Sequence, residues 1–216
     1  IFGCEIHTIG RSATEIYGGD RKTLTPARHF IENCHLHHFG RIDRTYTPAV
    51  LLVGVGNRIA HNLMHDGPSS VMRIGGNDHL IEFNEAYNAV TESDDQGAVD
   101  MWGNPAYRGN TFRYNYFHHI GRTGDEHFVW GQAGLRLDDT ISGQIIYGNV
   151  FAHCSRGGFG GVQIHAGRDN IFDNNIFYAC NTGVSGGWSP HNYIWQGLKD
   201  GTHHLAKNDY HNTQLY

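Results

Sequence analysis

The stretches Ile81-Glu-Phe-Asn84, Phe112-Arg-Tyr-Asn115 and Ile146-Tyr-Gly-Asn149 share one signature, an apolar residue three positions before an asparagine. Other positions of the 216-residue chain continue the series: Cys4, Cys34, Asn62, Asn175 and Asn208. Neighbouring members of this ladder are 22 to 34 residues apart. A unit that recurs at this length without a long helical pattern is typical of a solenoid.

Alternating apolar and polar residues form a short segment ahead of the signature in the middle repeats. The segments are Val71-Met-Arg-Ile-Gly75, Val99-Asp-Met-Trp102, Leu135-Arg-Leu-Asp138 and Val162-Gln-Ile-His165. A period of two indicates half-buried strands, and turn residues such as Gly76-Asn77 follow them. The signature itself predicts a second strand, and pairs such as Val150-Phe151 predict a third.

Three strands per repeat predict an all-β fold, a right-handed parallel β-helix of about seven coils. We expect a single domain over residues 1–216. The chain opens in the middle of a repeat, so we interpret it as a piece of a longer β-helix.

Repeated side chains at equivalent positions indicate structural stacking. Each ladder asparagine is expected to adopt a left-handed conformation at a bend and to bond the backbone of the next coil. Five histidines follow the ladder by three residues and predict a stacked outer column rather than a metal site: His7, His37, His65, His118 and His211. Cys4, Cys34, Cys154 and Cys180 fall at equivalent positions in pairs, and we expect buried free thiols because stacked side chains point in parallel.

Composition excludes several classes of function. The net charge of -5 and the lack of a Lys/Arg cluster argue against nucleic-acid binding. No apolar run approaches the about 18 residues of a membrane span. Phosphate-loop, His-Glu-x-x-His and Cys-x-x-Cys motifs are absent from the sequence, so we expect no cofactor and no metal. We also expect a monomer.

The first strands of the repeats place two columns of side chains on the outer face. One column reads Glu15, Leu52, Arg73, Asp100, Arg136, Gln163 and Ser185, and the other reads Tyr17, Gly54, Gly75, Trp102, Asp138, His165 and Gly187. The inward positions are then Val71 or Met72, Ile74, Val99, Met101, Leu135, Leu137, Val162 and Ile164. An indole offers a flat platform for a sugar ring, and arginine offers a rigid fork for hydroxyls or carboxylates. The middle coils are therefore expected to expose a functional face.

Acidic residues gather at the same height, in Glu92-Ser-Asp94-Asp95-Gln-Gly97 and in Asp138-Asp139. Glycosidic cleavage needs two carboxyl groups, one to protonate the leaving oxygen and one to act as nucleophile or to activate water. Neighbouring coils about 4.8 Å apart can supply such a pair, for either a retaining or an inverting reaction. The segment Asp125-Glu-His127-Phe-Val-Trp130 is expected to form a wall of the cleft.

Several runs resemble secreted bacterial parallel β-helix proteins of carbohydrate degradation, in particular glycoside hydrolase family 141. The resemblance covers nearly the whole chain. It is carried by Tyr17-Gly-Gly-Asp-Arg21, Gly54-Val-Gly-Asn-Arg58, Gly76-Asn-Asp-His79, Ile81-Glu-Phe-Asn-Glu85, Ser93-Asp-Asp-Gln-Gly97, Arg108-Gly-Asn110, Arg113-Tyr-Asn-Tyr-Phe117, Leu137-Asp-Asp139, Ile146-Tyr-Gly-Asn149 and Gly167-Arg-Asp-Asn170. It implies a secreted or periplasmic bacterial glycoside hydrolase that acts on a plant or algal polysaccharide.

Carried over from the resemblance, the two catalytic aspartates fall on the Asp94-Asp95 turn and on Asp138-Asp139, and we choose Asp95 and Asp138. The expected substrate-binding residues are Arg73, Asp100, Trp102, His127, Arg136, Gln163 and His165. Two alternatives stay open. One is a polysaccharide lyase, with Arg136 or Arg73 neutralising a uronate and His165 or His127 as base. The other is a non-catalytic carbohydrate-binding module or adhesin.

Overall fold

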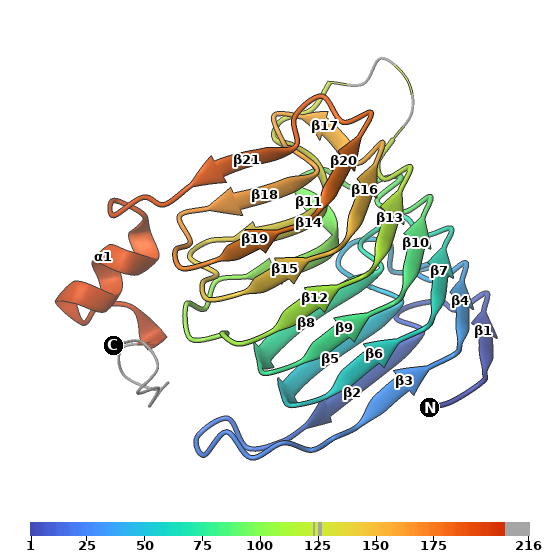
Figure 1. Cartoon of the computed structure of the whole chain (residues 1–216), viewed down its shortest axis with the longest axis horizontal. Helices are drawn as coiled ribbons and strands as arrows, with labels where there is room; N and C mark the ends of the chain where they lie inside the picture. Colours follow the sequence, from blue (N-terminus) through green and yellow to red (C-terminus); the bar gives the residue numbers. More distant parts are fainter. Residues whose placement is uncertain (123, 125–126, 206–216) are drawn as a thin grey trace.

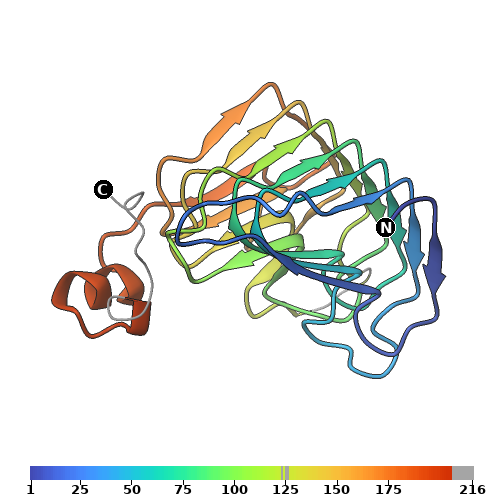
Figure 2. The ribbon, with the colours of Figure 1, turned by 90° about the horizontal axis from the view of Figure 1, so that it is seen from below.

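The computed structural model describes residues 1–122, 124 and 127–205, and three parallel sheets run along the chain. Figure 1 shows the coils stacked side by side, and Figure 2 shows the same stack from below. The first sheet contains β2 (Thr14–Gly18), β5 (Val50–Val55), β8 (Met72–Asn77), β11 (Gln96–Trp102), β14 (Gly131–Asp138), β18 (Val162–His165) and β21 (Val184–Gly187). β17 (Ser155–Gly157) pairs with β14 in the antiparallel sense.

The second strands of the coils form a sheet of their own, which carries the residues before the ladder. It contains β3 (Phe30–Glu32), β6 (Arg58–Ala60), β9 (Leu80–Glu82), β12 (Thr111–Arg113), β15 (Ile145–Tyr147) and β19 (Ile171–Asp173). The third strands, which come directly after the ladder position, form the last sheet. They are β1 (Glu5–His7), β4 (His35–His37), β7 (Leu63–His65), β10 (Glu85–Tyr87), β13 (Tyr116–His118), β16 (Val150–Ala152) and β20 (Ile176–Tyr178). The arrangement is a parallel β-helix, as predicted.

Hydrogen bonds between coils confirm the asparagine ladder. Asn115 Nδ2 donates to Ile81 O at 3.0 Å and to Asn149 Oδ1 at 3.0 Å. Asn115 Oδ1 in turn accepts from the backbone N–H of Asn84 at 3.0 Å. Each amide thus satisfies buried backbone groups at a bend, which would otherwise destabilise the fold. Asn208 lies outside the described residues.

The left-handed residue of each bend is not the asparagine, and that expectation was wrong. It is the residue before the asparagine, for example His61, Phe83 and Tyr114 with φ of 56°, 54° and 57°. The asparagine is buried with its amide aimed along the stack, whereas the preceding side chain points outward. Exposed rings stack there, with centroids 5.0 Å apart for His61 and Phe83.

The core contains the side chains that were predicted to point inward. Val71, Met72, Ile74, Val99, Met101, Leu135, Leu137 and Val162 are buried, and Ile164 is partly buried. The predicted outer column was wrong at one coil, where Leu51 rather than Leu52 pairs with Arg73, and Val53 rather than Gly54 pairs with Gly75. Leu52 is instead a core residue.

The stacked histidine column is confirmed for the described residues. His7 stacks on His37, His37 on His65, and Tyr87 lies between His65 and His118. His211 lies outside the described residues. All four cysteines are free, but only Cys34 and Cys154 are buried.

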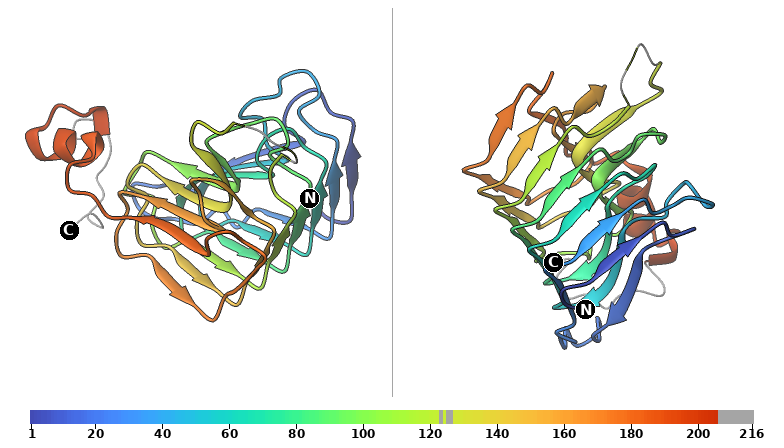
Figure 3. Two further views of the ribbon diagram at one scale, coloured as in Figure 1. Left: turned by 90° about the horizontal axis from the view of Figure 1, so that it is seen from above. Right: turned by 90° about the vertical axis from the view of Figure 1, so that its right-hand side faces the viewer.

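After β21 the chain leaves the β-helix and forms α1 (Tyr193–Asp200), which lies to one side of the stack in Figure 3. The Asn192 side chain caps its N-terminus, and Gly201 ends it in a left-handed conformation. Leu205, the first residue of the last predicted repeat, lies in a helical turn rather than in a strand, and residues 206–208 of that repeat lie outside the described residues.

Candidate functional site

Three neighbouring strands, β8, β11 and β14, carry the central part of the outer face. Arg73, Asp100 and Arg136 are register partners on these strands. Trp102 and Asp138 are partners two residues further along. The parallel pairing therefore brings together the side chains that the sequence had placed in two columns.

A pocket of about 380 Å³ lies on this face. It is lined by Tyr46, Arg73, Asp95, Asp100, Trp102, Arg136, Asp138 and Asp139. Of the candidate site residues that the structure describes, His127, Gln163 and His165 are not among the lining residues. His127, which was predicted to form a wall of the cleft, is exposed, and Gln163 is buried. Asp125 and Glu126 of the same predicted wall lie outside the described residues.

Arg136 organises the carboxylates of the pocket. Its Nη2 lies 2.7 Å from Asp95 Oδ1 and 2.7 Å from Asp138 Oδ2. These two oxygens can therefore be no further apart than twice that distance. This upper limit matches the about 5–5.5 Å between the two carboxyl groups of retaining glycosidases. It is shorter than the about 6.5–9.5 Å between those of inverting glycosidases.

The outer face is less exposed than the sequence suggested. Asp100, Arg136, Asp138 and Gln163 all point outward in register, yet they are 2%, 6%, 5% and 9% exposed. Arg136 is enclosed by the three aspartates, and its guanidinium lies over the Phe159 ring at 5.7 Å. Trp102 stays half-exposed at the edge of the pocket.

Burial raises the pKa of both members of the pair. For Asp95, Arg136 opposes this effect, and the carboxylate of Asp138 adds to it. For Asp138, Arg136 and a hydrogen bond from His165 oppose it, whereas Asp139 adds to it. The His165 Nδ1 atom is 3.1 Å from Asp138 Oδ1.

Asp100 is the most perturbed carboxyl group of the site. Burial raises its pKa to about 7, although Arg136 and Arg73 oppose this shift. Neither of its oxygens has a hydrogen-bond partner among the described residues, and Arg136 Nη1 is 3.7 Å away. Close to neutral pH this group is therefore partly protonated, as a carboxyl group in a poorly solvated site is expected to be.

Asp139 holds the rim of the pocket together. Its carboxylate accepts from Trp102 Nε1 at 3.0 Å and from Asn192 Nδ2 at 3.0 Å. It also accepts from the Tyr193 hydroxyl at 3.1 Å, and burial followed by this carboxylate raises the pKa of Tyr193 to about 12. Asp139 thus fixes the Trp102 indole and joins the start of α1 to the β-helix.

Asp94, the other member of the first acidic pair, caps the loop before β14. Its carboxylate accepts from the backbone N–H groups of Val129 at 2.7 Å and Gly131 at 2.8 Å. Burial would raise its pKa, but these backbone hydrogen bonds outweigh it and lower the pKa. Asp94 therefore has a structural role, which leaves Asp95 as the member that faces the pocket.

Tyr46 is a pocket residue that the sequence analysis missed. The Arg73 guanidinium lies 4.5 Å from the centre of its half-exposed ring. Tyr46 sits on the loop between β4 and β5, outside the repeat, so no column contained it. An aromatic residue in an otherwise polar loop, Asp43-Arg-Thr-Tyr46, is the signal that could have indicated it.

Asp138, Asp139 and His165 offer three ligand atoms within 4.8 Å of one another, so they could in principle hold a metal ion. The cationic Arg136 already contacts Asp138 at 2.7 Å. Because the Arg136 guanidinium would repel a divalent cation at Asp138, we assign no metal to these three residues.

Of three comparisons with known proteins, the one with family models supports this architecture. Neither curated proteins nor solved structures gave a match to the chain. Among the described residues, no helix is both long and apolar enough to cross a membrane. The sequence model of one family, described as the right handed beta helix region, matches residues 48–189, which is more than half of the chain. Domains of this family occur in polysaccharide-degrading enzymes and in non-catalytic proteins. The chain thus belongs to the right-handed β-helix family.

Proposed function

We propose that this β-helix is a glycoside hydrolase and that Asp95 and Asp138 are its catalytic pair. The observation that carries the proposal is the shared contact of both carboxylates with Arg136 Nη2 at the wall of a pocket. Two carboxyl groups at this spacing in one cleft, in different hydrogen-bonding environments, are typical of glycosidases. The half-exposed Trp102 beside them offers the apolar platform that a sugar ring needs.

The two carboxyl groups differ in their hydrogen-bond donors. Asp138 accepts from Arg136 and His165, which favours its ionised form, so we assign it as the nucleophile. Asp95 accepts from Arg136, and its side chain is 37% exposed, so water can reach it. We therefore assign Asp95 as the acid and base.

In the first step Asp95 gives its proton to the glycosidic oxygen while Asp138 forms a bond to the anomeric carbon. The carbon–oxygen bond to the leaving sugar breaks. In the second step Asp95 takes a proton from water, and that water displaces Asp138. The spacing of the pair favours this retaining course over the inverting one.

Charge favours hydrolysis over β-elimination. The pocket lining contains four aspartates and two arginines, and Arg136 is already engaged by carboxylates. A uronate carboxylate would enter a site with an acidic excess. We therefore propose a neutral polysaccharide as the substrate. The resemblance to glycoside hydrolase family 141 supports a plant or algal source for it and a secreted or periplasmic location for the enzyme.

The test is an activity assay on a panel of neutral plant and algal polysaccharides, with released reducing ends as the readout. Asp95→Asn and Asp138→Asn are each expected to lower the rate by about 10²–10⁴-fold. Asp43→Asn is the matched control, because Asp43 does not line the pocket and forms an exposed ion pair with Arg11. It should keep the wild-type rate.

The two roles separate on dinitrophenyl glycosides of the released sugar. Such a leaving group needs no proton, so bond cleavage by Asp95→Asn should recover, whereas Asp138→Asn should stay inactive. Wild-type rates in both variants would refute the pair. Formation of unsaturated, ultraviolet-absorbing products would show a lyase instead, and binding without cleavage would show a carbohydrate-binding module.

A further inference from the structure

A second cluster of ionisable side chains lies on the third sheet, whereas the pocket lies on the first. Glu5 comes from β1, and His35 and His37 come from β4, where Glu5 and His35 are direct register partners. Glu5 Oε1 is 3.5 Å from His35 Nδ1 and 3.3 Å from His37 Nε2. One ligand atom from each residue lies within 4.8 Å of the other two.

These spacings match the edges of a metal coordination tetrahedron. Zinc lies about 2.0–2.1 Å from imidazole nitrogen and about 2.0–2.2 Å from carboxylate oxygen, which places two ligands of one ion about 3.3–3.5 Å apart. The distances from Glu5 to both histidines fall in this range. A small movement of the exposed Glu5 side chain can centre the ion.

The neighbouring hydrogen bonds orient the His35 ring for a metal. His65 Nδ1 lies 2.8 Å from the Asp66 carboxylate and therefore carries a hydrogen. Neutral His65 then has its lone pair on Nε2, which is 2.7 Å from His35 Nε2. His35 must donate at Nε2, so its free lone pair is on Nδ1, the atom that faces Glu5.

His37 also has a second imidazole next to it. His37 Nδ1 lies 2.7 Å from His38 Nδ1, and His38 Nε2 lies 3.9 Å from Asp66 Oδ2. His37 Nε2 is also 3.3 Å from Glu5 Oε1, so without a metal its N–H donates to this carboxylate, and zinc binding would displace that hydrogen. Each ligand histidine is thus contacted by a second imidazole, and for His35 that imidazole is held by the Asp66 carboxylate.

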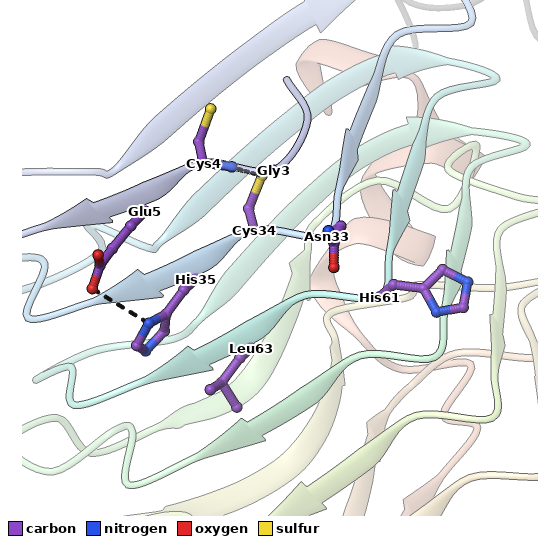
Figure 4. Close-up of a pocket in the computed structure, with 8 residues that line it drawn as sticks. All are labelled: Gly3, Cys4, Glu5, Asn33, Cys34, His35, His61 and Leu63. Atoms are coloured by element: carbon purple, nitrogen blue, oxygen red, sulfur yellow. Dashed lines mark hydrogen bonds and ion pairs between the residues drawn. The ribbon is translucent and has the colours of Figure 1, made fainter.

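We propose that Glu5, His35 and His37 form a binding site for a zinc ion, with the fourth position open to solvent. Two imidazoles and one carboxylate suit zinc, whereas calcium and magnesium prefer sites built from oxygen alone. Glu5 is 62% exposed in its side chain, so the site is open from outside. Figure 4 shows the Glu5 carboxylate directed at the His35 ring, while the Cys4 and Cys34 sulfur atoms point away from it. The thiols are therefore not ligands.

The same sheet contains a matched comparison. Glu85 on β10 pairs in register with Tyr116 on β13, and His118 Nε2 lies 3.1 Å from Glu85 Oε1. Tyr116 takes the place of His35 in this arrangement, so only one imidazole faces the carboxylate. The pair of Glu85 and His118 should therefore not retain zinc.

The experiment is calorimetric titration of the metal-free, tag-free chain with zinc chloride, and cobalt chloride with visible absorption reports the geometry. One site is expected, with tetrahedral cobalt bands. Glu5→Gln and His35→Ala should each weaken binding at least about 100-fold, and Asp66→Asn should weaken it about 10–100-fold, as loss of an outer partner does. Glu85→Gln should leave binding unchanged.

Glu5 is exposed, so Glu5→Gln keeps the fold, which circular dichroism checks for every variant. Wild-type affinity in Glu5→Gln or His35→Ala would overturn the proposal. So would an equal loss in Glu85→Gln, because it would show diffuse binding to surface histidines. Absence of zinc binding in the folded wild-type chain would also overturn it.

Discussion

At the residue scale, one arginine is surrounded by more carboxyl groups than it can neutralise. Arg136 contacts Asp95 and Asp138 at 2.7 Å and lies 3.7 Å from Asp100. Three carboxylates cannot all be ionised around one guanidinium in a buried place without a large cost. Asp100 is the one with no hydrogen bond to its oxygens, so it takes up the proton first.

This arrangement makes stability depend on pH in a defined direction. The pKa of Asp100 is raised from 3.8 to about 7 by burial, so the folded protein binds this proton more tightly than the unfolded chain. The contribution of Asp100 to wild-type stability should fall as pH rises from about 4 to about 7, because this carboxyl group ionises more easily in the unfolded state. Asp100→Asn removes this ionisation. It should therefore stabilise the chain by about 1–3 kcal/mol at pH 8 and show no gain at pH 3.5.

Denaturant unfolding at the two pH values measures the effect. Asp43→Asn is the control, because its side chain is exposed in a surface ion pair. Asp100→Asn should also keep most of the activity that we propose below pH 7, since there a neutral amide replaces a mostly protonated carboxyl group. Loss of activity in Asp100→Asn with wild-type activity in Asp95→Asn would instead make Asp100 the acid.

At the element scale, glycines set the register of the first sheet. Gly54 pairs with Gly18 on one side and with Gly76 on the other. Gly76 has φ of 112°, and a Cβ atom there would lie 1.9 Å from the Gly54 carbonyl oxygen. No side chain fits between the coils at this corner.

Gly76→Ala should therefore destabilise the chain by about 2–4 kcal/mol, from the steric clash and the strained backbone together. Gly103→Ala is the matched control. Gly103 also has positive φ, 76°, but a Cβ atom there meets nothing within 4 Å. It should cost about 1 kcal/mol, which is the backbone strain alone. Equal losses in chemical denaturation of the two variants would show that the close approach at Gly76 does not matter.

These glycines also explain what the sequence could and could not predict. Alternation in the strands around Arg73, Asp100 and Arg136 gave the correct register. The run Val50–Val55 is apolar throughout, so period two gives no indication of its face, and the predicted column slipped by one residue there. The glycine stack, which fixes that register, is visible only once the coils are placed.

A ladder could be predicted from the sequence only where the same residue type recurs at equivalent positions of the coils. The asparagine ladder repeats one residue type and was predicted. A second ladder at another bend uses Asn57, His79, Asn110, Gln144 and Asn170, and it was missed because its members differ. Tyr46 was missed for a related reason, since loops between strands do not follow the repeat. Burial of Arg136 likewise depends on side chains from several coils and on Phe159.

At the scale of the whole molecule, stability in a solenoid is carried by contacts between neighbouring coils. Strands β8, β11 and β14 in the middle are almost entirely buried, whereas β1, β2, β19, β20 and β21 alternate or are largely exposed. The candidate pocket lies on the middle strands, so its carboxylates are on or next to the most deeply buried strands of the first sheet. Rigid support is what a catalytic pair of fixed spacing requires.

Amide hydrogen exchange should therefore be slowest in β8, β11 and β14 and fastest in the outer coils, because local opening of an outer coil breaks fewer contacts.

A stack of phenylalanines allows a sharper test. Phe117 is 1% exposed and stacks on Phe151 at 5.4 Å, and Phe151 stacks on the partly buried Phe177 at 5.2 Å. Phe117→Ala should cost about 3–5 kcal/mol and speed exchange in the middle coils. Phe177→Ala should cost less and speed exchange only around β16, β20 and β21, because its cavity lies where fewer coils depend on it. Hydrogen-exchange mass spectrometry on both variants measures this difference. If exchange became faster by the same factor along the entire chain in each variant, the coils would unfold as one unit, and stability would not depend on contacts between neighbouring coils.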